Sequence, residues 1–136
     1  VEECIEMQEV ETAVLGNGDP KAAGVVGELV PVVEFYTYEA KYIDGTTLLH
    51  IPGRVSEETS LKLRQTAEKA FKAIGCEGFS RIDFFVRKSD GEVILNEINT
   101  IPGFTSISMY PKLWDYCGVS YSELIDRLIR LGLERK

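Results

Sequence analysis

The sequence is poor in the residues that catalysis by histidine or cysteine needs. It has one histidine, His50, which lies in an apolar run typical of a strand, so we expect no nucleophilic triad built on it. The three cysteines, Cys4, Cys76 and Cys117, form no Cys-x-x-Cys pair and cannot all be bridged to one another. We expect them to be reduced, as in a cytoplasmic protein. No apolar run approaches the roughly 20 residues of a membrane-spanning helix.

Positive charge is also scarce. The sequence has 15 Lys and Arg against 22 Asp and Glu, which gives a net charge of -7. This balance argues against nucleic acid or an anionic membrane as a partner. A nucleotide-binding protein needs only local positive charge, which a metal ion, an arginine and a lysine or two supply. The length of 136 residues suits one domain, residues 1–136, with a core of its own.

Apolar spacing and turn signals predict the order of the elements. Strands are predicted at 10–16, 27–35 and 46–51, followed by a helix that Ser56 caps and that ends near residue 74, before Gly75. A short helix is predicted at 110–117, and Ser120 with Glu123 forms a capping box for a last helix. The strands and helices show no βαβ regularity. We therefore predict an α+β fold with a mainly antiparallel sheet flanked by helices.

Two further predicted strands carry the chemistry of the sequence, residues 81–85 and 96–100. Alternate side chains of a strand share a face, so Arg81 lies with Asp83, and Glu97 lies with Asn99. Carboxylate and amide oxygens are ligands for magnesium, which proteins usually hold together with substrate phosphates. An arginine beside them suits phosphate binding and points to nucleotide chemistry. The alternative is a solvated outer face of a two-sided sheet.

The turn at residues 88–92 decides whether the two pairs share one face. A two-residue type I′ turn would place Asp83 opposite Ile98, whereas a three-residue loop with Gly91 in the left-handed conformation pairs Lys88 with Glu92 and Asp83 with Glu97. The three-residue loop is favoured because it gathers the apolar side chains on one face, with Asn96 as the only polar interruption of the second strand. It pairs Ile82 with Ile98 and Val86 with Ile94, and leaves three apolar residues beside the charges as a floor for a nucleotide base: Phe85, Val93 and Leu95.

Three stretches, at 38–42, 80–85 and 95–111, closely resemble the D-alanine–D-alanine ligases of the ATP-grasp superfamily. The last stretch, Leu-Asn-Glu-Ile-Asn-Thr-Ile-Pro-Gly-Phe-Thr-Ser-Ile-Ser-Met-Tyr-Pro, is long and specific. The resemblance covers essentially the whole chain in order. It implies a C-terminal ATP-grasp domain of an enzyme that uses ATP to join two D-alanines through an acyl phosphate, for peptidoglycan precursor synthesis.

The resemblance also assigns roles around the charged strands. It implies that two magnesium ions, or manganese in their place, are held by Asp83, Glu97 and Asn99, with Glu97 bridging. Arg81 would steady the transferred phosphoryl group. The backbone N–H of Gly103 would hold the developing oxyanion, and Ser108 with the N–H of Met109 would hold the carboxylate of the second D-alanine. Without the surrounding motif, the favoured interpretation of Gly103 would be a plain Pro-Gly turn, and that of Ser108 a helix cap.

The resemblance places the nucleotide along the start of the chain and a closing loop. The hinge that faces adenine corresponds to Glu2, Glu3, Cys4 and Ile5, and Glu9 corresponds to the acid that grips the ribose. The closing loop runs from Phe35 to Tyr42 and excludes water from the acyl phosphate. In it Lys41 would meet the γ-phosphate and Tyr42 would reach the N-terminal domain. Phe35 and Phe85 would lie beside the nucleotide.

The chain begins without a methionine and resembles only the C-terminal third of such an enzyme. We expect a fragment, inactive alone, whose partners are D-alanine and the N-terminal and central domains of the same enzyme, a homodimer when full length. Without those domains we expect residues 36–45 to lack order. Two alternatives stay open: an isolated Mg-nucleotide-binding domain without catalysis, and another ATP-grasp carboxylate–amine ligase, including the D-Ala–D-lactate and D-Ala–D-serine types.

Overall fold

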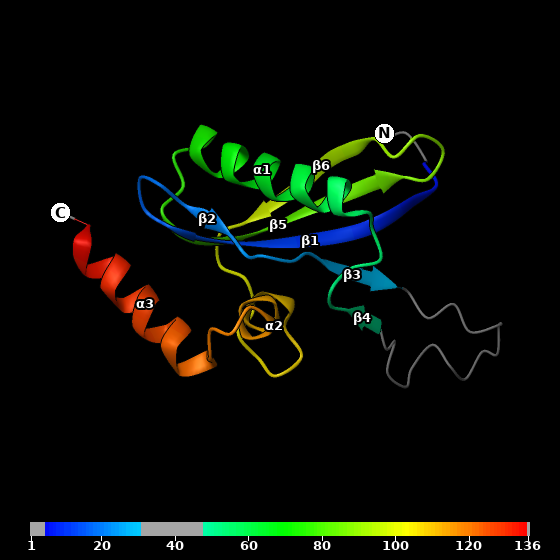
Figure 1. Ribbon diagram of the computed structural model, residues 1–136. Helices are drawn as coiled ribbons and strands as arrows, with labels where there is room; N and C mark the ends of the chain where they lie inside the picture. Colours follow the sequence, from blue (N-terminus) through cyan, green and yellow to red (C-terminus); the bar gives the residue numbers. More distant parts are fainter. Residues whose placement is uncertain (1–4, 31–47, 136) are drawn as a thin grey trace, which may run out of the picture.

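The computed structural model describes residues 5–30 and 48–135. Its centre is a six-stranded sheet in which every pair of neighbours is antiparallel, in the order β4-β3-β1-β5-β6, with β2 paired to β1 (Figure 1). The strands are β1 (Met7–Gly16), β2 (Lys21–Ala22), β3 (Gly27–Val30), β4 (Leu48–His50), β5 (Gly78–Arg87) and β6 (Val93–Asn99). The helices are α1 (Glu57–Ala73), α2 (Met109–Tyr116) and α3 (Tyr121–Glu134). The predicted α+β class is confirmed.

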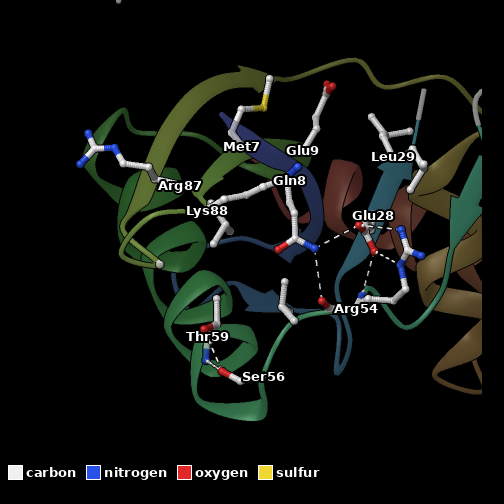
Figure 2. A pocket seen from close by; sticks show the side chains of 14 residues that line it. Met7, Gln8, Glu9, Glu28, Leu29, Arg54, Ser56, Thr59, Arg87 and Lys88 are labelled. Atoms are coloured by element: carbon white, nitrogen blue, oxygen red, sulfur yellow. Dashed lines mark hydrogen bonds and ion pairs between the residues drawn. The ribbon is translucent and has the colours of Figure 1, made fainter. Parts of the chain in front are cut away.

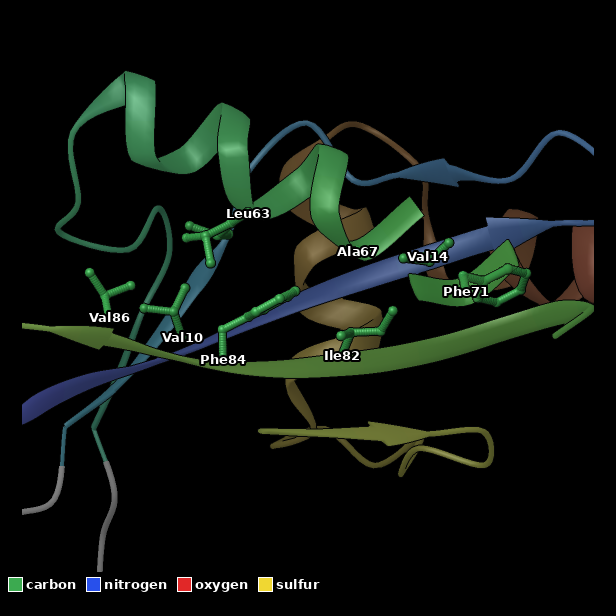
Figure 3. Close-up of a cluster of buried hydrophobic side chains, with 9 residues drawn as sticks. Val10, Val14, Leu63, Ala67, Phe71, Ile82, Phe84 and Val86 are labelled. Atoms are coloured by element: carbon green, nitrogen blue, oxygen red, sulfur yellow. The ribbon is translucent and has the colours of Figure 1, made fainter. Parts of the chain in front are cut away.

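Helix α1 covers one face of the sheet and begins and ends where the sequence predicts. The hydroxyl of Ser56 accepts a hydrogen bond from the Thr59 N–H at 3.1 Å, and the helix stops before Gly75, whose φ is +65°. That φ favours glycine because it has no Cβ to clash. Beneath the helix, side chains of α1, β1 and β5 form a closed apolar cluster (Figure 3): Leu63, Ala67, Phe71, Val10, Val14, Ile82, Phe84 and Val86.

Helices α2 and α3 pack on the opposite face of the sheet (Figure 1). Ala13 and Leu15 of β1 lie in this second cluster with four large side chains of the helices: Tyr110, Leu113, Trp114 and Leu124. The buried hydroxyl of Tyr110 donates to the Val14 carbonyl at 3.0 Å and ties α2 to the middle of the sheet. At the start of α3, the Ser120 hydroxyl accepts from the Glu123 N–H, as predicted. No helix in the described part of the chain is long and apolar enough to cross a membrane.

The β5–β6 hairpin corrects the predicted turn. Near the charged residues the pairing is as predicted, with Ile82 opposite Ile98 and Asp83 opposite Glu97. Nearer the turn the register shifts by one residue: Val86 pairs with Val93 instead of Ile94, and the Arg87 N–H donates to the Glu92 carbonyl. The loop is therefore four residues long, 88–91, although Gly91 does adopt the left-handed conformation with φ +72°.

A β-bulge absorbs the extra residue. The shift falls between Asp83 and Phe84, where the partners jump from Glu97 to Leu95, so Asn96 is left without an opposite residue. The predicted polar interruption at Asn96 is thus removed from the ladder. The predicted apolar floor of Phe85, Val93 and Leu95 is also wrong in two of its members: Val93 packs against the α1 cluster, and Leu95 is the partner of Phe84 on the same side. Ile94, the partner of Phe85, lies on the charged face instead.

Candidate active site

Three acidic residues form a row across three neighbouring strands of the charged face, β1, β5 and the edge strand β6. Glu11 of β1 is the register partner of Asp83 of β5, and Asp83 is the partner of Glu97 of β6. In the adjacent row of the same face, Arg81 pairs with Asn99. The structure therefore brings together all four predicted side chains of the two strands, and it adds Glu11.

The guanidinium of Arg81 lies among the three carboxylates of this row. Its Nε and Nη2 donate to both oxygens of Asp83, at 2.8 and 2.7 Å. Its Nε also lies 3.3 Å from Oε1 of Glu11, and its Nη2 lies 3.9 Å from Oε1 of Glu97. The hydrogen bonds to Asp83 raise the pKa of Arg81 further, so this side chain is a permanent cation.

Glu11 is the most unusual carboxylate of the site. Its residue is only 4% exposed, and its Oε2 has no hydrogen-bond partner among the described residues. Burial, followed by the neighbouring charge of Asp83, raises the pKa of Glu11 to about 7, and the charge of Arg81 opposes this rise. Burial, followed by the charge of Asp83, also raises the pKa of Glu9. The site therefore carries more negative charge than Arg81 balances.

Glu11 was not predicted from the sequence, although a signal for it was present. Glu9 and Glu11 are two residues apart on one strand, so they must point to the same face. The apolar residues Val10 and Val14 point to the other face, toward α1. The pattern that identifies Glu11 is an acid inside the strand predicted at 10–16, on the same face as Glu9.

The oxygen donors of this face suit a hard cation. Asp83, Glu97 and Asn99 offer only carboxylate and amide oxygens, and the surplus of negative charge favours divalent ions. The Oδ1 of Asn99 accepts from the Ile101 N–H at 3.1 Å, which orients the amide at the end of β6. Within residues 5–30 and 48–135, no group of three or more His, Cys, Asp or Glu side chains is arranged to hold a metal ion. The predicted set has two such side chains, and its third member is an asparagine.

The loop before α2 places Gly103 beside Ser108. Ser108 is the N-cap residue of α2, but its hydroxyl makes no capping hydrogen bond. It accepts instead from the Thr105 N–H at 3.0 Å and lies 2.9 Å from the Thr105 hydroxyl. A Cβ on Gly103 would lie 2.8 Å from Oγ of Ser108, so the close approach needs glycine. The predicted roles of both residues in substrate binding stay predictions.

Aromatic side chains fix this loop on the sheet. The ring of Phe104 packs against Phe79, Tyr110 and Tyr121, with centroid distances of 5.4 to 6.1 Å. The Tyr121 hydroxyl donates to the Phe104 carbonyl at 3.0 Å. Residue 104 is thereby anchored directly next to Gly103, on a rigid support from β5, α2 and α3.

Some of the predicted nucleotide-binding residues can be placed. Glu9 is the register partner of Phe85, on the same face as Glu11 and Asp83. Ile5 lines a shallow pocket with Glu6, Arg87, Lys88 and Ser89. The remaining predicted residues, Glu2, Glu3, Cys4, Phe35, Lys41 and Tyr42, lie outside the described residues, as does the loop 36–45.

A cavity of about 730 Å³ lies where β1 and β3 approach the start of α1 (Figure 2). Its polar centre is Glu28, whose oxygens accept from the Arg54 guanidinium, the Arg54 backbone N–H and the Gln8 amide. These hydrogen bonds, chiefly those of the Arg54 side chain, lower the pKa of Glu28 to about 2. Figure 2 shows Met7 and Glu9 pointing away from this cluster. Glu28 and Arg54 therefore form a structural ion pair, separate from the charged face.

The fold and the site together define an α+β domain with an arginine held among acids on one face of an antiparallel sheet. A family model described as D-ala D-ala ligase C-terminus matches residues 1–130. A D-alanine–D-alanine ligase of Chlorobium phaeobacteroides is 58% identical over 135 residues, which cover 99% of this chain and 37% of the relative. The chain belongs to the D-alanine–D-alanine ligase family, in its C-terminal part.

Solved structures agree with this family. The D-alanine–D-alanine ligase of Coxiella burnetii superposes with a TM-score of 0.84 at 41% identity, over 98% of this chain and 34% of that chain. The VanG D-Ala:D-Ser ligase of Enterococcus faecalis superposes with a TM-score of 0.81, also at 41% identity, over 96% of this chain and 37% of that chain. The chain spans little more than a third of the length of these relatives.

Proposed function

We propose that this chain is the catalytic C-terminal part of an ATP-dependent ligase that joins two D-alanines to D-alanyl-D-alanine through an acyl phosphate. The observation that carries the proposal is the Arg81 guanidinium bound to Asp83 and next to Glu97, on a face that also bears Asn99. A permanent cation among oxygen donors suits phosphoryl transfer, in which an enzyme positions the phosphoryl group and stabilises its charge.

Each residue has a defined part in this proposal. Asp83, Glu97 and Asn99 would hold magnesium, which neutralises the phosphate charges of ATP when bound. Arg81 binds oxygens of the transferred phosphoryl group, a task that suits its fixed fork of donors. The Gly103 N–H faces the developing oxyanion, and Ser108 with the Met109 N–H binds the carboxylate of the second D-alanine. Glu9 and Phe85 contribute to the nucleotide site from the same face.

The whole protein supplies the remainder of the active site. Because the chain spans about 37% of the curated relative's length, we infer that N-terminal and central domains bind the first D-alanine and cover the nucleotide. Residues 35–42 would close over the site, with Lys41 at the γ-phosphate and Tyr42 at the N-terminal domain. We further propose a cytoplasmic enzyme that is a homodimer at full length and forms a precursor of peptidoglycan.

A second candidate differs only in the second substrate. The chain is equally identical, at 41%, to a D-Ala–D-Ala ligase and to a D-Ala:D-Ser ligase. Phosphate release by the full-length enzyme with D-alanine, D-serine and D-lactate as second substrates separates the two. We expect D-alanine to give the highest kcat/KM, and a preference for D-serine or D-lactate would favour the second candidate.

Replacement of Glu97 tests the proposed site. In the full-length enzyme, Glu97→Gln should lower kcat by about a hundredfold or more, because an amide is a neutral and weaker ligand for a divalent ion. The fold should persist, since the Glu97 side chain is 59% exposed. Glu92→Gln is the matched control just before the same strand, because the Glu92 side chain is similarly exposed and forms a surface ion pair with Arg87. Near-normal turnover of Glu97→Gln would refute the site.

A further inference from the structure

Glu11 has no part in the function proposed above, yet it lies at the centre of the site. Its side chain is 5% exposed, one oxygen has no partner, and the other lies 3.3 Å from Nε of Arg81. Burial of a carboxylate that is only partly paired costs stability. An apolar side chain at this position would avoid that cost, so stability alone does not explain a glutamate here.

The contacts of Arg81 show what Glu11 offers. Nε of an arginine carries a single hydrogen, and Oδ1 of Asp83 takes it at 2.8 Å. Oε1 of Glu11 lies 3.3 Å from the same nitrogen as an ion pair, close enough to become the acceptor if Asp83 releases that hydrogen. Glu97 lies near the other end of the guanidinium, at 3.9 Å from Nη2. Glu11 is therefore positioned to accept the Nε–H if Asp83 no longer does.

The proposed function requires a second acceptor for the Nε–H of Arg81. Both oxygens of Asp83 are bound by Arg81, and the same oxygens are the ones proposed to ligate magnesium. An Asp83 carboxylate that turns to a cation gives up its hydrogen bonds to Arg81. Without another acceptor, the long arginine side chain would lose its fixed orientation when it has to meet the phosphoryl group.

We propose that Glu11 is a positioning residue that takes over the Nε–H of Arg81 when Asp83 binds the magnesium ions. The guanidinium then stays in place, and its Nη groups are free for the oxygens of the transferred phosphoryl group. The inference rests on the proposed function and deepens it. Glu11 suits this task because its backbone is fixed between two strands, with Asp83 opposite on β5 and Gly27 opposite on β3.

The test compares two substitutions in the full-length enzyme. Glu11→Leu removes the acceptor, and we expect kcat to fall about 10- to 100-fold, the value of a hydrogen bond to a charged group. KM for ATP and for D-alanine should change little, because the lost interaction acts in the transition state. Glu11→Gln keeps an oxygen at the same distance along the side chain and should retain an intermediate kcat.

Thermal unfolding distinguishes positioning from a structural role. Glu11→Leu leaves Arg81 paired with Asp83 and removes a buried, unpartnered oxygen, so Tm should stay equal or rise while kcat falls. The matched control is Thr12→Val on the same strand, because Thr12 is fully buried, its hydroxyl has no partner, and it faces the other side of the sheet. In this control Tm should likewise be kept or raised, with kcat unchanged.

A spectroscopic measurement follows Arg81 without turnover. With Mg²⁺ and a non-hydrolysable ATP analogue, the ¹⁵N–¹H signal of Arg81 Nε, assigned by its loss in Arg81→Lys, should persist in the unmodified enzyme and broaden in Glu11→Leu. Normal kcat in Glu11→Leu, or a parallel fall of kcat and Tm, would overturn the role of Glu11. An unmodified enzyme that releases no phosphate with D-alanine would instead overturn the proposed function.

Discussion

At the scale of the residue, a buried glutamate has different hydrogen-bond partners on the two faces of the sheet. Glu28, on the α1 side, accepts four hydrogen bonds and has a lowered pKa, whereas Glu11, on the charged side, has an unpartnered oxygen and a raised pKa. Both are 4% exposed or less. The difference lies in the partners rather than in burial: among the described residues, Arg54 pairs with no acid except Glu28, while Arg81 lies within ion-pair distance of three acids.

Glu28 gives a prediction about acid stability. Its pKa of about 2 in the folded state lies below its ordinary value of 4.5, so between these values the unfolded chain binds more protons. Its contribution is therefore complete above pH 4.5 and is lost as the pH falls toward 2. Allowing for the exposure of Arg54, we expect about 1 to 2 kcal/mol. Urea unfolding of the chain with Glu28→Gln should show this deficit at pH 6, and the deficit should shrink by pH 2.5.

Glu57→Gln is the control for that measurement, because the Glu57 side chain is 88% exposed and, within the described part of the chain, pairs only with Arg64. Its free energy of unfolding should follow that of the unmodified chain at both pH values. A deficit of Glu28→Gln that is the same at pH 2.5 as at pH 6 would contradict the assignment of this ion pair as the source of the effect.

Single residues were predictable from the sequence where a local rule applied. Asp83, Glu97 and Arg81 follow from the alternation of side chains along two strands, and Ser56 follows from its capping position. The contact of Ser108 with Thr105 was not predictable, because Ser108 occupies an N-cap position whose usual hydrogen bond it does not make. Glu28 also gave no signal, since its partner Arg54 is 26 residues away and belongs to a different segment.

At the scale of the element, the start of α2 depends on close contact with β3. A Cβ on Gly27 would collide with Sδ of Met109 and would lie 2.6 Å from its Cε. Met109 is the first residue of α2, and its backbone N–H is the proposed partner of the second D-alanine's carboxylate. The absence of a side chain at Gly27 thus lets a helix terminus lie directly against the sheet.

Gly27→Ala tests this contact. Met109 must move to accept the new methyl group, so we expect about 1 to 3 kcal/mol lower stability and a several-fold higher KM for the second D-alanine. KM for ATP should change less. Steady-state kinetics and thermal unfolding of the full-length enzyme measure both effects. In the control Gly24→Ala, the added Cβ meets only Cys117 Sγ at 3.5 Å, an ordinary contact. Equal kinetic effects of the two substitutions would contradict the proposed link.

The elements themselves were largely predictable, but their exact pairing was not. Helix α1 follows from its cap, its apolar spacing and Gly75. The hairpin turn was predicted one residue too short, because a continuous ladder was assumed from Arg81 to the turn. The bulge at Asn96 satisfies the acid alignment and the apolar pairing of Val86 with Val93 at once, and no single regular register does so.

At the scale of the whole molecule, the sheet separates the apolar core under α1 from the face that carries the charged residues of the site. The face under α1 is apolar, with Phe71, Phe84 and Ile82 fully buried. The other face is apolar only where α2 and α3 pack, and it carries the acids and Arg81 toward the start of β1 and the bulge of β6. The alternation of strand residues predicted two unlike faces. The sequence did not reveal that two helices share one of them with the site.

This arrangement predicts weak nucleotide binding by the chain alone. A ligand on one face of a sheet keeps much of its surface in water, whereas ligand sites usually bury most of it. Titration calorimetry of residues 1–136 with Mg-ATP should show binding at least tenfold weaker than that of the full-length enzyme, and no D-alanine-dependent phosphate release. Micromolar binding by residues 1–136 would show that this part of the enzyme holds the nucleotide without its other domains.

The bulge on β6 also limits how the hairpin can change in length. One unpaired position between Leu95 and Glu97 sets which side of the sheet every later side chain of that strand occupies. Removal of that position would give a regular ladder, with Leu95 still opposite Phe84 and Glu97 still opposite Asp83, whereas an inserted residue between Glu97 and Asn99 would turn Asn99 to the apolar side. Insertions among natural variants should therefore fall in the loop at 88–91, a single deletion in β6 should fall at the bulge, and the segment from Glu97 to Asn99 should keep its length even where its residues change.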